Sequence, residues 1–164
     1  MMPTKEEVLE KLEEDRNAFA SMDLSGIDLS GSNLNNVDFF GTNLSDANLE
    51  DCNLDEACLD AANLEGAKLA RATFRKAKLE EAIFEKADLT EAFFEEAVLS
   101  SARLDEAIIE GASFLKTDLG NVGFYDAKGK GAKFVGSKLF MANFDYADVS
   151  EADFTMCNLQ FASF

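Results

Sequence analysis

A five-residue period runs through most of this chain. Starting from Leu24 and stepping by five to Phe164 gives 29 positions without a phase slip, and 26 of them are Leu or Phe; the exceptions are Ile109, Gly129 and Val149. An α-helix would spread these centres around its whole surface, and a flat strand would send successive centres to opposite faces. A chain that turns a corner after every five residues keeps them all inside. The period therefore predicts a polygonal β-solenoid.

The positions of the large aromatic residues give the number of sides. A step of 20 leads from Phe74 to Phe94 and Phe114, whereas a step of 15 leads from Phe74 to Leu89. Four sides per coil therefore sort the Phe centres into two columns on opposite faces, and the centres on the side between them become smaller, as close packing requires. We expect about seven coils and a rod ~35 Å long, at ~4.8 Å per coil.

The repeats "ANLED", "ANLEG", "ADLTE" and "ANFDY" resemble the A(D/N)Lxx motif of the pentapeptide-repeat family, and the resemblance covers residues 22–164. It implies an all-β fold, a right-handed quadrilateral parallel β-helix, with residues 21–164 as a single domain behind an N-terminal cap in residues 1–20. Function does not follow from the fold alone.

The N-terminal segment carries the signals of a capping helix. Thr4 and Glu7 form a capping-box pattern, and Val8, Leu9 and Leu12 form an apolar stripe. We predict a helix over roughly residues 4–18 that lies across the first coil, because the exposed edge of a stacked coil needs a cover.

Outward positions become apolar toward the C-terminal end, while the repeats continue to Phe164. Clustered exposed apolar residues indicate an interface. One interpretation is an end-to-end homodimer, which the family resemblance also implies, and the other is that the chain stops short of a native cap. The candidate interface consists of Leu115, Val135, Phe140, Met141, Met156 and Phe161.

Composition excludes several classes of function. The chain has 32 acidic and 15 basic residues, a formal charge of −17 and no His. This balance argues against direct binding to nucleic acid or to an anionic membrane, and favours a basic protein partner. The charged start and the lack of a long apolar run predict a cytoplasmic protein without a membrane segment. Three irregularly spaced Cys indicate reduced thiols rather than a disulfide framework or a metal site.

Four-sided phasing also stacks acidic residues along one corner, with Lys86 as the only basic residue expected nearby. These carboxylates could imitate a nucleic-acid backbone in a basic groove of another protein; the resemblance implies DNA gyrase or topoisomerase IV, which quinolone-resistance members of the family bind. Against this, those members often carry interrupting loops, for which the unbroken period leaves no room. Alternatively, the acids only keep the rod soluble. The stripe consists of Asp46, Glu65, Glu85, Asp105, Asp126 and Asp145.

The sequence favours a non-enzymatic protein-interaction or scaffold module. Paired acids such as Glu80–Glu81 and Glu95–Glu96 fall on convex corners, without the cleft and the base partner that catalysis needs. "DAKGKGAKF" lacks the spacing of a phosphate loop, and no residues indicate a cofactor or metal site. We expect a protein partner at the C-terminal corners or at irregular outward residues, namely Ile83, Phe93, Val98 and Ile108.

Overall fold

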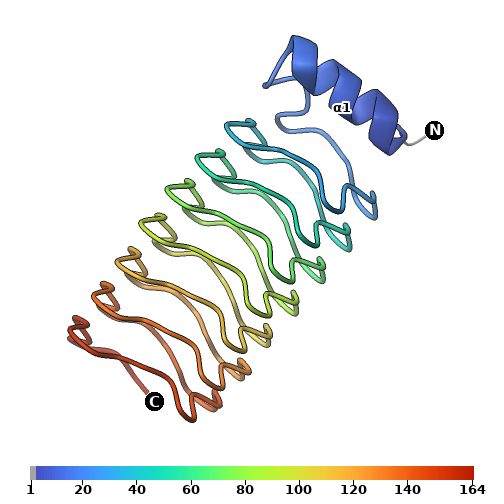
Figure 1. Ribbon diagram of the computed structural model, residues 1–164. Helices are drawn as coiled ribbons and strands as arrows, with labels where there is room; N and C mark the ends of the chain where they lie inside the picture. Colours follow the sequence, from blue (N-terminus) through green and yellow to red (C-terminus); the bar gives the residue numbers. More distant parts are fainter. Residues whose placement is uncertain (1–2) are drawn as a thin grey trace.

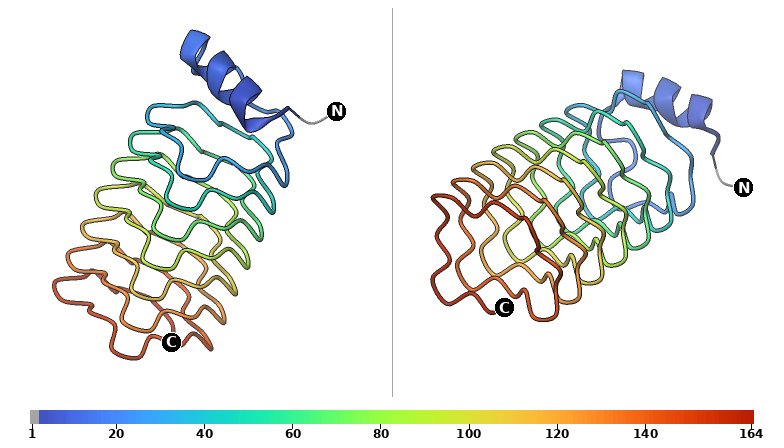
Figure 2. Two further views of the ribbon diagram at one scale, coloured as in Figure 1. Left: turned by 45° about the vertical axis from the view of Figure 1, so that its right-hand side comes forward. Right: turned by 60° about the horizontal axis from the view of Figure 1, so that its bottom comes forward.

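The structure, a computed structural model, describes residues 3–164 as one helix followed by a stack of coils (Figure 1 and Figure 2). Helix α1 spans Lys5–Glu14. Seven coils of 20 residues then run from residue 22 to residue 161, and residues 162–164 begin an eighth. No extended strands form among the described residues; instead, single-residue parallel bridges pair every fifth residue with the residue 20 positions later, from Asp23–Asn43 to Asn143–Ser163. The predicted right-handed, four-sided parallel β-helix is confirmed.

Each five-residue repeat has an inner small position, an outward position, an inner centre and two corner positions. The centre N–H donates to the next coil, as from Leu24 to the Asn43 carbonyl (2.8 Å), and so does the second corner N–H. The outward N–H donates to the preceding coil, as from Asn48 to the Ile27 carbonyl (2.8 Å). The N–H of the small residue closes the corner on the preceding centre, as from Ile27 to Leu24 (3.2 Å). Backbone acceptors thus satisfy four of the five N–H groups.

Side-chain oxygens satisfy many of the remaining N–H groups, those at the first corner position. Where the outward residue is Asp or Asn, its own Oδ1 accepts this bond, as from Ser25 N to Asp23 (3.0 Å). Where it is another residue, an Asp at the first corner of the preceding coil can replace it: Asp55, Asp60 and Asp105 accept from the residues 20 positions later at 2.8–2.9 Å. Buried or half-buried N–H groups need such partners, so the recurrent Asp and Asn have a structural cause.

The second corner position requires a left-handed backbone. Its φ angles lie between +55° and +71°, and 22 non-glycine residues adopt this conformation. Such a φ costs a non-glycine residue about 1 kcal/mol. The second corner N–H, however, donates to the next coil, as from Glu56 to the Arg75 carbonyl (2.8 Å). Stacking of the coils therefore holds the strained corners in place.

From Phe74 onward the interior contains two columns of stacked aromatic rings, whereas the buried centres of the first two coils are mainly Leu. The rings of Phe74 and Phe94 lie 4.7 Å apart at 2°, which confirms the predicted 20-residue register, and rings from opposite columns meet edge to face at 5.6–6.2 Å. Gly129 occupies a centre between the columns, where an added Cβ would lie 3.1 Å from Ile109 Cδ1. Ile109 thus already fills this space, as the predicted volume compensation requires.

Polar residues at inner small positions donate to the carbonyl 23 residues earlier. Thr117 Oγ1 bonds the Phe94 carbonyl at 2.7 Å, and Cys52 Sγ bonds the Leu29 carbonyl at 3.0 Å. Burial raises the pKa of the Cys52 thiol to about 11, so this thiol stays protonated. Ser32 lies in the first coil, and its buried Oγ has no partner within residues 3–164, because no coil precedes it.

Helix α1 covers the N-terminal end of the stack. Thr4 and Glu7 form the predicted capping box, and Val8 and Leu12 are buried. The predicted extent of roughly residues 4–18 is wrong at its C-terminal end, because the helix stops at Glu14 and Asp15 is extended. The physical reason lies in the backbone that follows: the Arg16 carbonyl accepts the Asp38 N–H at 3.0 Å and so already belongs to the first coil.

Candidate functional site

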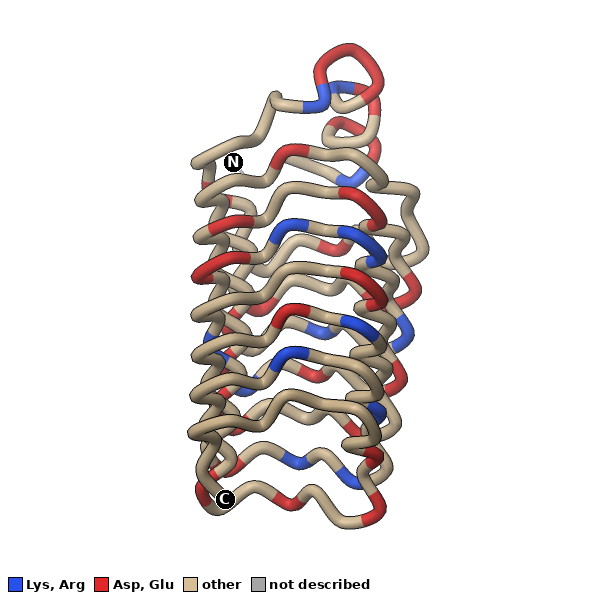
Figure 3. Tube along the Cα trace, turned by 90° about the vertical axis from the view of Figure 1, so that its left-hand side faces the viewer, with Lys and Arg blue, Asp and Glu red and all other residues tan. Residues whose placement is uncertain are grey.

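The six acidic residues of the predicted stripe follow one corner of the rod, which we call the acidic corner. One of the six lies on each of coils 2 to 7; four occupy the first corner position, and Asp46 and Asp126 occupy the second. All six are half-buried or exposed. Figure 3 shows that basic segments interrupt the acidic ones elsewhere along the rod. The geometry therefore brings the six carboxyl groups into a single column.

Two of these carboxylates have basic partners. Arg103 Nε lies 3.3 Å from Glu85 Oε1, and Lys86 Nζ lies 3.9 Å from Glu65 Oε1. The prediction that Lys86 is the only basic residue near this corner is wrong. Arg103 was missed because it occupies an outward position rather than a corner, one coil after Glu85. Exposed pairs contribute little stability, but they reduce the negative field of the column.

Two further carboxylates of the acidic corner fold over glycines of the next coil. An added Cβ at Gly123 would lie 2.7 Å from Asp105 Oδ1, and one at Gly66 would lie 2.6 Å from Asp46 Oδ1. Asp105 uses this closeness to accept the Tyr125 N–H at 2.9 Å. One oxygen of the Asp105 carboxylate is therefore already used as a backbone hydrogen-bond acceptor within the stack.

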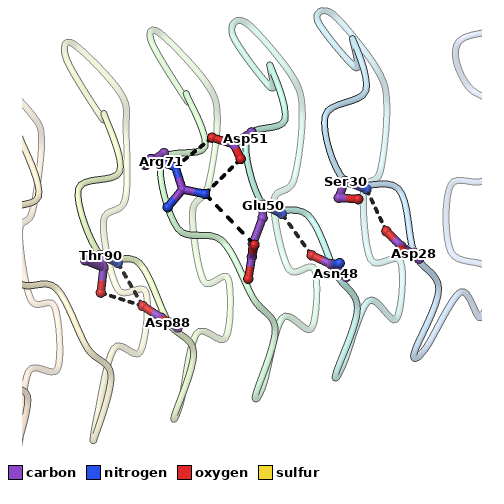
Figure 4. A network of polar contacts seen from close by, with 8 residues as sticks. All are labelled: Asp28, Ser30, Asn48, Glu50, Asp51, Arg71, Asp88 and Thr90. Atoms are coloured by element: carbon purple, nitrogen blue, oxygen red, sulfur yellow. Dashed lines mark hydrogen bonds and ion pairs between the residues drawn. The ribbon is translucent and has the colours of Figure 1, made fainter.

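The adjoining corner carries a polar network (Figure 4). Arg71 makes a bidentate pair with Asp51, with both N–O distances at 2.8 Å, and its Nη2 lies 4.0 Å from Glu50. The Ser30 N–H donates to Asp28 at 2.9 Å, and this backbone hydrogen bond is the main cause that lowers the pKa of Asp28. These carboxylates are turn acceptors and ion-pair partners on a convex surface.

The predicted C-terminal interface residues lie on two adjoining corners. Leu115, Val135 and Met156 share one corner; the first two are half-buried and Met156 is 85% exposed. The other corner holds Phe140, Met141 and Phe161. Rings of Phe140 and Phe161 meet edge to face at 5.6 Å, with Phe161 72% exposed. The structure thus brings the predicted residues together as two short apolar columns.

Sequence reasoning missed two tyrosines near the C-terminal end of the rod. The rings of Tyr125 and Tyr146 lie 5.3 Å apart on the acidic corner, and a hollow beside them is lined by Asp145, Tyr146 and Phe164. Tyr125 occupies the first and Tyr146 the second corner position of successive coils at the same corner, which the four-sided phasing could have shown. The last coil has four exposed second-corner residues; the fourth is Glu151, and we call the other three, Tyr146, Met156 and Phe161, the apolar collar.

The collar surrounds the inner centres of the last coil. Val149, Phe154 and Leu159 are half-buried centres of the last coil, and Phe164 is exposed. Their N–H groups have no backbone acceptor within residues 3–164, whereas the centres of earlier coils donate to the next coil. The end therefore presents apolar side chains together with unpaired backbone.

Neither a metal centre nor a membrane segment is found in the described part of the chain. No group of three or more Cys, Asp or Glu side chains in residues 3–164 is arranged to hold a metal ion. Over the same residues, no helix has both the length and the apolar character needed to cross a membrane.

Comparisons with known proteins place the fold. A family model described as pentapeptide repeats matches eight copies, over residues 22–55, 57–95 and 84–114. Among curated protein sequences, none matches the chain. A pentapeptide repeat protein from the thylakoid lumen of Arabidopsis thaliana is similar over 62% of this chain and 71% of its own, with 33% identity and a TM-score of 0.61.

Two solved structures match over nearly the whole rod. HetL, a pentapeptide repeat protein involved in heterocyst differentiation regulation in the cyanobacterium Nostoc, is 22% identical over 99% of this chain and 94% of its own, with a TM-score of 0.53. QnrB1, a plasmid-mediated fluoroquinolone resistance protein, is 21% identical over 91% of this chain and 85% of its own, with a TM-score of 0.52. At these identities the likeness concerns the fold alone.

Proposed function

Because this chain belongs to the pentapeptide-repeat family, we propose that it is a non-enzymatic protein-recognition module that acts in the cytoplasm. The observation that carries the proposal is the apolar collar. Earlier coils place mostly polar or charged residues at the second corner, whereas the last coil places Tyr146, Met156 and Phe161 there, 72–85% exposed. Exposed apolar side chains gathered at one end of a rod support an association surface.

A second copy of the chain is the proposed partner at the collar. The uncovered edge offers centre N–H groups and small-residue carbonyls, so it is complementary to itself about a two-fold axis. Head-to-tail stacking is blocked, because helix α1 covers the opposite end with Val8 and Leu12. A tail-to-tail pair is therefore the arrangement that buries both open cores.

Sedimentation velocity over a range of concentrations tests this self-association. We expect the 164-residue chain to approach twice its mass of 17.9 kDa, and we expect Phe161→Glu to remain monomeric. Phe40→Glu is the matched control, because Phe40 is 50% exposed on the first coil, far from the collar. A wild-type chain that stays monomeric at the highest concentration, or equal effects of both variants, would contradict the proposal.

A second candidate function is the imitation of duplex DNA in the groove of DNA gyrase or topoisomerase IV. Charge density is the observation that favours it: residues 22–164 hold 26 acidic and 12 basic residues, and seven coils span ~34 Å. The excess of acidic over basic residues gives one net negative charge per ~2.4 Å of rod, against one per ~1.7 Å in duplex DNA. The ion pairs of Glu65 and Glu85 weigh against it, because they weaken the acidic corner.

A supercoiling assay separates the two functions. DNA mimicry predicts that the protein inhibits gyrase, and that Asp126→Asn with Asp145→Asn relieves the inhibition, since these two carboxylates make no ion pair within residues 3–164. Glu110→Gln, outside the acidic corner, serves as the control. If micromolar protein does not inhibit gyrase, DNA mimicry is ruled out, and the proposal of protein recognition through the collar is not affected.

A further inference from the structure

One face of the rod carries side chains whose charge alternates from coil to coil. On this face, whose centres include Phe74 and Phe94, each coil presents three outward side chains, which we call a rung. The rungs of coils 2 to 5 are Asp51, Asn53 and Asp55; Arg71, Thr73 and Arg75; Glu91, Phe93 and Glu95; and Gly111, Ser113 and Leu115. The net charge of the rung is negative on coil 2, positive on coil 3 and negative on coil 4, and the rung of coil 5 is uncharged.

Contacts between neighbouring rungs follow this alternation. Arg71 pairs with Asp51 at 2.8 Å, and Arg75 Nε lies 3.3 Å from Glu95 Oε2. The Arg75 guanidinium also lies 5.5 Å from the centre of the Phe93 ring. The chain's own arginine therefore already makes a cation–π contact and a carboxylate contact at the Phe93 rung.

A hollow of about 430 Å³ opens where the alternation stops. Small residues, Gly111 and Ser113, line it beside Phe93, whose side chain is 36% exposed, and Leu115 adds a second apolar wall. The Ser113 hydroxyl already has a hydrogen-bond partner, because its Oγ donates to Glu95 Oε1 at 2.9 Å. Within residues 3–164, Glu91 makes no side-chain hydrogen bond or ion pair. The hollow thus offers a carboxylate without a direct ion pair beside an aromatic ring, and the lining arginine, Arg71, is already paired with Asp51.

We propose that this hollow binds an arginine or lysine side chain from a basic segment of a partner protein. The guest cation would occupy the place of the missing positive rung, pair with Glu91 and contact Phe93 on the side opposite Arg75. Its aliphatic stem would pack on Leu115. Arg71 lines the hollow on the coil before Glu91, and Lys133 lines it on the coil after Gly111, so repulsion from both keeps the charged head at the Glu91 and Gly111 rungs between them.

This inference rests on the proposed protein-recognition function and names the chemistry of a partner, but it uses a surface separate from the apolar collar. Self-association and peptide binding can therefore fail independently. A chain that stays monomeric yet binds the peptide removes the tail-to-tail pair and keeps the hollow. A chain that dimerises but does not bind the peptide overturns the proposed binding site in the hollow and keeps the tail-to-tail pair.

A short peptide titration tests the site. The probe is acetyl-Arg-Gly-Ser-Gly-Arg-amide, followed by amide chemical shifts of the 15N-labelled full chain. We expect shifts at Gly111, Ser113 and their neighbours, and binding about tenfold weaker for the analogue with citrulline in place of arginine, because citrulline keeps the shape and loses the charge. Equal binding of the citrulline analogue, or shifts elsewhere only, would overturn the proposal.

Matched variants locate the binding energy. Glu91→Gln is expected to weaken binding roughly threefold and Phe93→Leu roughly three- to fivefold. Glu106→Gln is the control, since Glu106 is also an exposed second-corner residue, with φ +59° against +56° for Glu91. Thermal unfolding confirms that each variant is folded. If Glu91→Gln and Glu106→Gln weaken binding equally, the interaction is general attraction to an acidic protein and the assigned site is wrong.

Discussion

At the scale of single residues, carboxylates and amides act as backbone partners before they act as charges. Asp23 accepts the Ser25 N–H within its own repeat, and Asp105 accepts the Tyr125 N–H from the next coil. Both arrangements satisfy the first corner N–H, which has no backbone acceptor. An acidic residue on this rod can therefore be required for the corner even where its charge is not.

Two substitutions at Asp105 separate these roles. Asp105→Asn keeps an oxygen for the Tyr125 N–H, so we expect the free energy of unfolding to change by less than about 0.5 kcal/mol. Asp105→Ala removes the acceptor and leaves the N–H unpaired, which costs about 1 kcal/mol. Urea unfolding followed by circular dichroism measures both. An Asn variant as unstable as the Ala variant would show that charge, rather than hydrogen bonding, matters here.

At the scale of elements, helix α1 and the first coil stabilise each other. Val8 and Leu12 are buried against the interior, and the Asp38 N–H finds its acceptor in the Arg16 carbonyl just after the helix. In a stacked repeat protein each coil contacts only its neighbours, so loss of the cap acts first on the coils nearest to it.

Leu12→Glu tests this local dependence. The side chain of Leu12 is 1% exposed, so the change buries a charge and removes apolar contacts, at a cost of about 3 kcal/mol. Hydrogen exchange should then lose protection at amides of the first two coils, such as Leu29, while Phe94 stays protected. Glu13→Gln, at an exposed neighbouring position, is the control. Equal loss of protection throughout the rod would contradict nearest-neighbour stacking.

The sequence predicts the elements unevenly. The five-residue period and the spacing of the Phe residues were sufficient to predict the four-sided coil, because every repeat buries the same two positions, the small residue and the centre. The end of α1 was not predictable from the apolar stripe, because it depends on the Arg16 carbonyl meeting Asp38, which is distant in sequence. The Glu85–Arg103 pair was missed for a similar reason: the outward Arg103 reaches across one coil to a corner carboxylate.

At the scale of the whole molecule, acid should weaken the stack through its depressed carboxyl groups. Hydrogen bonds from backbone and side chains lower the pKa of Asp23, Asp28 and Asp153 below 3.8. A depressed folded-state pKa gives stability that is present above the unfolded value and is lost as the pH falls through the folded value. Relief of repulsion among the many acids acts in the opposite direction over the same range.

Thermal unfolding between pH 6 and pH 2 distinguishes the two effects. We expect the wild-type melting temperature to fall below about pH 4. Asp28→Asn keeps an acceptor for the Ser30 N–H but cannot titrate, so its melting temperature should fall less over the same range. A wild-type chain that gains stability down to pH 3 would show that charge repulsion dominates the acid response.

The strict 20-residue register has a consequence for how such a protein can change in length. Duplication of one whole coil would move everything beyond it by ~4.8 Å along the axis, without rotating any side chain to a different face. The distance between the Phe93 hollow and the apolar collar can therefore be altered only in fixed increments. The separation of two surfaces on this rod is therefore set by the number of whole coils between them.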